Sequence, residues 1–370
     1  MILYALIALT TIILAYMTIP IERHNEFHTF IYRGSRKQLK NQVLLIAIFL
    51  ILFSFSAVRY GIGNDYLQYV KTFHEISVGG YVVTEIGFNF LVKCIYFLCG
   101  FEAYEIVFAI FAFFTLWIFL YAMWKYSEDF QYTFFLFMAL GMYFQTYNTV
   151  RYYFALAVVM IAMQFVVQRK EISFLLLILA TAFIHKSVLI VIPLFFLARI
   201  TWKKWQVLLL VTASALCFLL QKPMLHLALY LYPSYRNTIY LEGGTSIISI
   251  IRCILVCLLT IKYFKTIVIQ NKTMLFYSRL NIMAIIVYVF FSFLPVITRV
   301  GYYLTISHVM YIPMLLRAIQ NEKERKLVKM GITILAIGYF LIFLYKANAP
   351  GVQLLPYQTW LFMEERIHIK

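Results

Sequence analysis

The stretch Arg59–Tyr69, "RYGIGNDYLQY", brings together residue types that could do chemistry and follows an almost wholly apolar run. It holds an arginine, an aspartate and three tyrosines. The glycines in "GIGND" permit backbone turns that other residues resist, so Asp65 can be held on a compact loop. A fixed, partly desolvated carboxylate suits the work of a general base. The stretch therefore predicts a polar site at the end of a hydrophobic helix.

Other charged residues recur where apolar runs end or break. Glu85 opens "EIGFNFLVKCIYFLCG", Arg151 lies in "NTVRYYFALAV", and His185 and Lys186 interrupt "FIHKSVLIVIPL". Charged side chains within apolar segments that cross a membrane usually face a water-filled cavity or an oppositely charged partner. Excess positive charge favours an anionic ligand, since arginine forks suit phosphate oxygens, while tyrosines suit stacking against sugar rings. We expect one polar site to collect Arg59, Asp65, Tyr66, Tyr69, Glu85, Arg151, His185, Lys186, Arg299 and Tyr302.

Two residues compete for the role of base in this site. Asp65 is favoured by its compact loop, and His185 competes because its imidazole titrates near neutral pH. Simpler explanations exist for single residues: Arg59 could end a helix, Lys186 could snorkel to the interface, and tyrosines could form an aromatic belt. The recurrence of the set favours a site between helices.

The composition predicts the elements that must position these residues. The chain is 64% hydrophobic and 13% charged, against roughly 25% charged in soluble domains. Apolar runs long enough to cross a bilayer recur along the chain, which predicts an all-α polytopic membrane protein of about twelve spans in a single domain, residues 1–370. The expected spans are residues 1–19, 42–58, 102–124, 132–147, 150–167, 172–184, 187–199, 205–221, 245–262, 275–296, 300–317 and 327–345.

The charge pattern indicates which ligands and which sides of the membrane to expect. The net charge of +17 lies mainly in short loops between spans, which predicts orientation signals and no nucleic-acid partner. The basic segment 21–41 is expected in the cytoplasm, so residues 59–101 emerge outside. The segments expected outside the cytoplasm contain few carboxylates and no D-x-D motif, so we expect that the protein binds no divalent metal and no cofactor.

Two segments decide the topology. Residues 85–100 carry Lys93 near the middle, which costs about 2.5–3.5 kcal/mol in a span, so we expect an amphipathic helix lying on the outer surface. Residues 172–198 are expected as two short helices that meet at the outer side and bring His185 and Lys186 to a wet cavity. The rival topology makes each of the two segments one span and inverts the middle third.

The quoted stretches, with "TEIGF" at residues 84–88, resemble in order the motifs of the EpsG family. This family comprises polymerase-like membrane proteins of bacterial capsule and exopolysaccharide clusters, grouped with Wzy polymerases. Beyond residue 200 the resemblance rests on "TRVGYY" and "LLPYQTWLF". The family commonly has glutamine directly after the arginine of "NTVR", where this chain has Tyr152, so no role of that amide is carried over. Asn64 stands where the family often has threonine.

The resemblance implies polymerisation of lipid-linked glycans at the outer face of the plasma membrane. A growing glycan on undecaprenyl pyrophosphate would move onto the distal sugar hydroxyl of a lipid-linked repeat, with a Wzz-like chain-length co-polymerase as a possible partner. By analogy with O-antigen ligases, the fold would be GT-C-like. Arg151, Lys186 and Arg299, with Arg59, would meet the charge of the leaving pyrophosphate, and single displacement would invert the anomeric centre.

Three other functions stay open at this point. A lipid-linked oligosaccharide flippase also needs many spans and a cationic cavity, although no internal repeat is seen. A membrane O-acyltransferase would use His185, but acyl-CoA lies on the cytoplasmic side. A structural subunit of an export complex would explain the hydrophobicity and not the recurring cations.

Overall fold

The computed structural model describes residues 1–20, 36–231, 244–245, 247–349 and 351–362. In these ranges the regular structure is helical, and a lone antiparallel bridge joins Arg59 to Thr359. The prediction of an all-α protein is confirmed for this part of the chain. The residues fall into two compact units, and the chain passes between them within α8, α9 and the short helix η1, and again after residue 319. The single-domain assignment stays a prediction.

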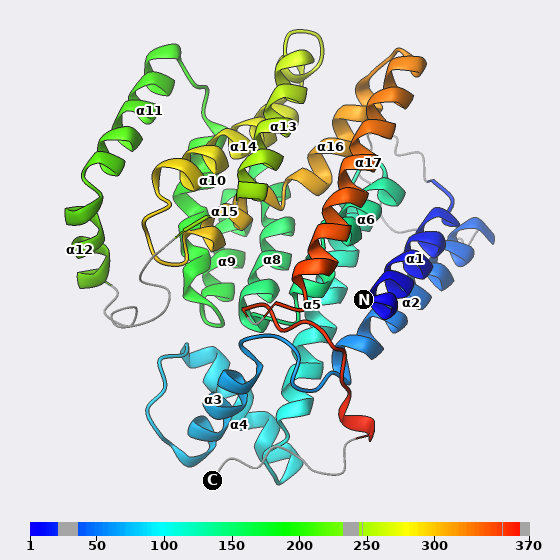
Figure 1. Cartoon of the computed structure of the whole chain (residues 1–370), viewed down its shortest axis with the longest axis vertical. Coiled ribbons are helices and arrows are strands. Elements are labelled where there is room, and N and C mark those ends of the chain that lie inside the picture. The colour runs from blue at the N-terminus through cyan, green and yellow to red at the C-terminus, as the bar shows by residue number, and fades with distance from the viewer. Residues whose placement is uncertain (21–35, 232–243, 246, 350, 363–370) are drawn as a thin grey trace. The chain divides into compact units, whose positions relative to one another are not determined.

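The first unit contains residues 1–161, 179–187 and 320–370. Helices α1 and α2 lie side by side, as do α3 and α4, and α2 packs along α5 (Figure 1). Its elements are α1 (Ile2–Tyr16), α2 (Arg36–Ala57), α3 (Tyr66–Val78), α4 (Ile86–Cys99), α5 (Tyr104–Tyr126), α6 (Phe130–Ala139), α7 (Met142–Gln145), most of α8 (Val150–Val167), α17 (Glu322–Lys346) and η5 (Trp360–Phe362).

The second unit contains residues 162–178 and 188–319. Helix α14 is its centre and packs against α10, α11, α13, α15 and α16. Its elements are most of α9 (Glu171–Ala182) and of η1 (Lys186–Ile190), with α10 (Val191–Arg199), α11 (Lys204–Leu219), α12 (Gln221–Leu231), α13 (Ile247–Lys262), η4 (Val268–Gln270), α14 (Lys272–Phe290), α15 (Ile297–Thr305) and α16 (His308–Ala318).

Local sequence signals set several helix ends. The side chains of Asp129, Asn271 and Asn321 accept hydrogen bonds from backbone N–H groups in the first turns of α6, α14 and α17. These N-caps satisfy donors that have no partner inside the helix. Gly79 and Gly100 end α3 and α4 in the left-handed conformation that favours glycine.

The chain is a multi-pass membrane protein. Five helices of the described ranges are long and apolar enough to cross a bilayer: α2, α5, α8, α14 and α17. A sixth candidate is the pair formed by α11 and α12, which is bent by 84°. Apolar side chains of α17 are widely exposed, including Leu327 at 66% and Ile334 at 62%, as expected for a lipid-facing helix. The predicted number of about twelve spans and the GT-C-like fold are not confirmed.

Several expected spans are shorter or broken. Residues 132–147 divide into α6 and α7, and residues 300–317 divide at Ile306 and Ser307 between α15 and α16. Helix α12 and helix α3 were not expected at all. The prediction is confirmed where an uninterrupted apolar run forms one helix, as in α5.

The break predicted within residues 172–198 is confirmed. Helix α9 ends at Ala182, and α10 follows the short 3-10 helix η1. The two arms fold back on each other, because Phe174 stacks on Phe195 and Arg199 pairs with Glu171 at 2.6 Å. The rival topology, with one continuous span here, is therefore wrong for this segment.

Helices α3 and α4 form a small lobe at one end of α5 (Figure 1), which we call the α3–α4 lobe (residues 60–103). One face of α4 is buried through Phe88, Val92 and Ile95. The opposite face exposes Phe90 at 68% and Phe97 at 86%, with Lys93 between them. The helix predicted for residues 85–100 is confirmed, and its position on a membrane surface stays a prediction.

Candidate functional site

The N-terminus of α8 is the point where the polar segments of the first unit meet. The Thr149 hydroxyl, just before the helix, donates to Asp65 Oδ2 at 2.9 Å. The Asn148 side chain accepts from the backbone N–H of Asn64 at 3.2 Å. Gly63 has a φ of +97°, and a Cβ there would lie 2.6 Å from the Tyr147 carbonyl oxygen. Glycine is therefore needed to bring the Asp65 loop against this helix end.

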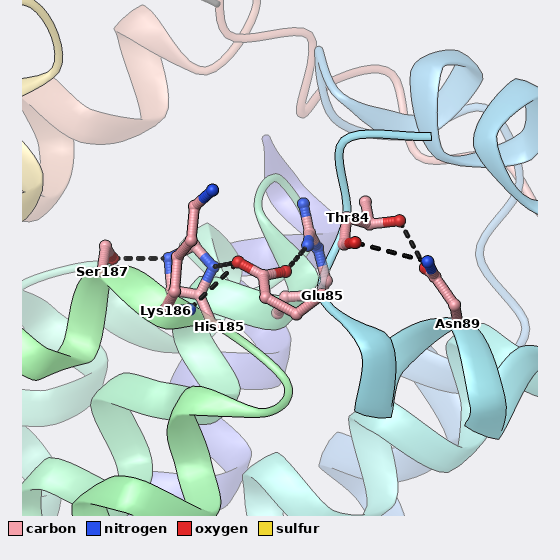
Figure 2. A network of polar contacts seen from close by, with 7 residues as sticks. Thr84, Glu85, Asn89, His185, Lys186 and Ser187 are labelled. Carbon is pink, nitrogen blue, oxygen red and sulfur yellow. Dashed lines mark hydrogen bonds and ion pairs between the residues drawn. The ribbon is translucent and has the colours of Figure 1, made fainter. Parts of the chain in front are cut away.

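Glu85 is the centre of a second set of contacts at the same helix end. Arg151, in the first turn of α8, donates through Nη1 to Glu85 Oε2. The backbone N–H of Lys186 donates to Glu85 Oε1 at 3.0 Å. Figure 2 shows the Glu85 carboxylate directed at the turn that carries His185 and Lys186. The side chains of Glu85 and Arg151 are 11% and 18% exposed, so a ligand could reach the pair.

His185 lies between this carboxylate and a serine. Its Nδ1 is 4.0 Å from Glu85 Oε1, and its Nε2 is 2.8 Å from the Ser187 hydroxyl oxygen. The ring of Tyr152 packs edge-on against the imidazole. His185 is buried, whereas Ser187 and Lys186 are exposed, and the Lys186 ammonium group extends away from the network (Figure 2).

A close backbone approach holds Glu85 against the histidine turn. A Cβ at Gly87 would lie 2.8 Å from the Phe183 carbonyl oxygen, so only glycine fits without a shift. The same carbonyl accepts from the backbone N–H of Phe88 at 3.3 Å, which satisfies a donor in the first turn of α4. Thr84 and Asn89 hydrogen-bond to each other beside Glu85 (Figure 2).

The C-terminal segment (residues 351–362) holds the Asp65 loop from the other side. It is red in Figure 1 and runs beside the loop that follows α2. The backbone N–H groups of Tyr60 and Gly63 donate to the carbonyls of Gln358 and Gln353. The Tyr357 hydroxyl donates to the Phe55 carbonyl at 2.8 Å, and burial raises its pKa to about 12, against the opposing effect of Arg59.

The EpsG family model matches residues 42–359. The chain belongs to the EpsG family. No curated protein and no solved structure matches it. The stretches on which the family resemblance rests include all the segments of the first unit described above: the Asp65 loop, the Glu85 turn, the start of α8, the histidine turn and the C-terminal segment. In this EpsG protein they converge within one unit.

Arg59 has a different place from the one predicted for it. It is 2% exposed, its Nη1 donates to the Ser56 carbonyl at 2.5 Å, and it stacks against the rings of Phe108 and Tyr147. Burial lowers the pKa of its guanidinium, opposed by the surrounding tyrosines. The side chain therefore caps the carboxyl end of α2 and is buried in this conformation, and the ligand-binding role predicted for Arg59 stays a prediction.

Tyr66 and Tyr69 are also buried, at 1% and 7% exposure. They belong to the core of the α3–α4 lobe, where Tyr66 stacks on Phe108. Neither ring offers an open face to a sugar in this conformation. In the structure both rings have a role in packing, and Arg151 lies over the Tyr69 ring at 5.8 Å. Their predicted role in binding stays a prediction.

Arg299 and Tyr302 lie in the second unit, on α15. Both are partly exposed. They thus belong to another unit than the polar site, and the prediction that they join it stays a prediction. In the same unit His308 Nε2 lies 2.8 Å from Asn281 Oδ1, and both residues are fully buried, a pair that the sequence analysis did not single out.

Thr149 and Ser187 are the site residues that the sequence analysis missed. Each lies two positions from a residue that it did select, Arg151 and His185. A hydroxyl beside a charged residue within an apolar run is the signal that could have found them. Among the described residues no three histidine, cysteine or acidic side chains are grouped as a metal site would require.

Proposed function

We propose that this EpsG-family membrane protein is a polysaccharide polymerase. It transfers a growing glycan from undecaprenyl pyrophosphate to the distal sugar hydroxyl of a lipid-linked repeat unit at the outer face of the plasma membrane. The observation that carries the proposal is the network of Glu85, Arg151 and His185, which joins three separate family stretches at one helix end.

The base in this mechanism is His185. It lies beside the Glu85 carboxylate, which can stabilise the imidazolium that forms when the acceptor hydroxyl loses its proton. Asp65 is hydrogen-bonded to Thr149 at the same helix end and is suited to orient the acceptor sugar. Both roles predict that Asp65→Asn lowers the rate less than His185→Ala does.

The leaving group is a lipid pyrophosphate, whose developing charge needs cations. Lys186 is exposed beside the base, and Arg151 presents a guanidinium at the helix end. The positive end of the α8 dipole adds to this field. Direct attack by the activated hydroxyl in one displacement inverts the anomeric centre, so a product that keeps the donor's configuration would disprove this route.

Two observations support placing the Glu85 network outside the cytoplasm: the distribution of basic residues along the chain and the character of helix α4. The exposed apolar face of α4, with Lys93 in its middle, suits a helix that lies in the outer interface. In this arrangement the network beside the N-terminus of α4 faces the lipid-linked substrates.

The test compares Arg151→Ala with Arg325→Ala in the host strain. Arg325 pairs with Glu322 near the start of α17 and is the matched control. We expect Arg151→Ala to abolish long polymer while single lipid-linked repeats accumulate at the outer face, and Arg325→Ala to leave polymer length normal. Repeats retained in the inner leaflet would indicate a flippase, and full-length polymer lacking only acetyl groups would indicate an acyltransferase.

A further inference from the structure

The two ring nitrogens of His185 face different surroundings. Nδ1 has no exposed surface and lies 4.0 Å from Glu85 Oε1. Nε2 lies 2.8 Å from the hydroxyl oxygen of Ser187, which is exposed (Figure 2). The imidazole thus has a carboxylate on its inner side and a surface hydroxyl on its outer side.

The contacts of Glu85 decide which nitrogen carries the proton. Arg151 and the backbone N–H of Lys186 both donate to this carboxylate, so its two oxygens act as acceptors. A carboxylate oxygen facing Nδ1 favours the proton on Nδ1. Nε2 then has a lone pair, so the Ser187 hydroxyl donates to Nε2, and Ser187 itself lies at the exposed side of the ring.

We propose that Ser187 is a catalytic proton relay between the acceptor sugar hydroxyl and His185. This inference rests on the proposed polymerase function and deepens it. The side chain that meets the acceptor is Ser187, because the imidazole behind it is 7% exposed and its Nε2 is already occupied by the serine oxygen.

The step balances without an added reactant. The acceptor hydroxyl gives its proton to Ser187 Oγ as the Ser187 proton passes to His185 Nε2. The sugar oxygen forms a bond to the anomeric carbon of the donor, and the bond from that carbon to the pyrophosphate oxygen breaks with its electron pair. His185 ends as an imidazolium beside Glu85, and the lipid pyrophosphate leaves as an anion near Lys186.

The experiment uses full-length protein reconstituted in lipid vesicles, with lipid-linked repeats extracted from a strain that lacks the protein. The variants are Ser187→Ala, which removes the hydroxyl, and Ser187→Thr, which keeps it. Ser54→Ala is the control, because the exposed Ser54 hydroxyl bonds to its own helix. We expect Ser187→Ala to lower kcat by roughly 100-fold with little change in KM, and Ser187→Thr to keep most of the rate.

A second readout separates proton relay from structural support. Transfer of two protons in one step gives a solvent deuterium isotope effect in the wild type, and we expect this effect to fall in Ser187→Ala. Unchanged kcat in Ser187→Ala, or equal losses in the alanine and threonine variants, would overturn the relay while the wild-type polymer ladder upholds the polymerase. If the wild type itself makes no polymer, the function fails and the relay fails with it.

Discussion

At the scale of single residues, Glu85 links more partners than any other group described in the site. Its two carboxylate oxygens meet a guanidinium from α8 and a backbone N–H from the histidine turn, and the imidazole lies nearby. Arg151 also lies over the Phe88 ring at 4.7 Å, so its position depends on both the charge and the aromatic ring. The identity of these residues was predictable from charges within apolar runs, but their pairing was not, since no local pattern encodes which charges meet.

Replacing Glu85 by glutamine tests this arrangement at the residue scale. The amide keeps the shape but leaves Arg151 without its counter-charge and removes the field that holds the His185 proton on Nδ1. We expect polymer formation in cells to fall by roughly 100-fold or more. The comparison is Glu322→Gln, which removes an exposed carboxylate paired with Arg325 near the start of α17. Similar polymer from both variants would contradict the role given to Glu85.

At the scale of elements, the site is built where short pieces meet the end of one long helix. The break at His185 was predictable, because two charged residues interrupt an apolar run. The packing of Tyr66 and Tyr69 was not, because a tyrosine in a helix serves equally well on a buried or an exposed face. The division of residues 300–317 was also missed, since single polar residues such as Ser307 within an apolar run do not by themselves predict the end of a helix.

Gly87→Ala tests the close approach between α4 and the histidine turn. The new Cβ would lie 2.8 Å from the Phe183 carbonyl oxygen and force the two segments apart. A small displacement of Glu85 from His185 is expected to lower the polymerisation rate roughly 10- to 100-fold. Gly331→Ala on α17 is the control, because a Cβ there meets nothing within 4 Å. Full activity of Gly87→Ala would show that the approach does not position the site.

In the α3–α4 lobe, the contacts of Glu102 with Ser77 and His74 depend on pH. Glu102 accepts from Ser77 at 2.5 Å and lies 3.0 Å from His74 Nδ1, so it ties α3 to the start of α5. Burial alone would raise the pKa of Glu102, but the hydrogen bonds from Ser77 and His74 outweigh it and the pKa is lowered.

A carboxyl group with a lowered pKa adds stability above its ordinary pKa of about 4.5, and this stability is lost as the pH falls below that value. We therefore expect the protection of α3 against hydrogen exchange, measured as the ratio of the intrinsic to the observed exchange rate, to fall on acidification below about pH 4.5. In Glu102→Gln this protection should be low at every pH. An equal fall in both proteins would place the pH dependence elsewhere.

At the scale of the whole molecule, the account requires that the α3–α4 lobe and the start of α17 lie on opposite sides of the membrane. Composition alone predicted a multi-pass protein, and the family match over residues 42–359 supports the proposed polymerase function. The number of membrane spans was harder to predict than the multi-pass character. Some apolar runs form helices too short to cross a bilayer alone, such as the 10-residue α6 and the 9-residue α10.

Orientation can be measured with single cysteines in a protein whose five native cysteines have been replaced. Lys93→Cys on α4 should react in intact cells with a maleimide that does not cross membranes. Lys323→Cys at the start of α17 should react only after the membrane is opened. The reverse pattern would place the site in the cytoplasm.

The most direct measurement is polymerisation by the purified protein in vesicles, with extracted lipid-linked repeats as the only glycan and a metal chelator present. The account predicts a ladder of polymer from the wild type, and single repeats from His185→Ala and Glu85→Gln. Absence of a ladder from well-folded wild type, or an unchanged ladder from both variants, would contradict it.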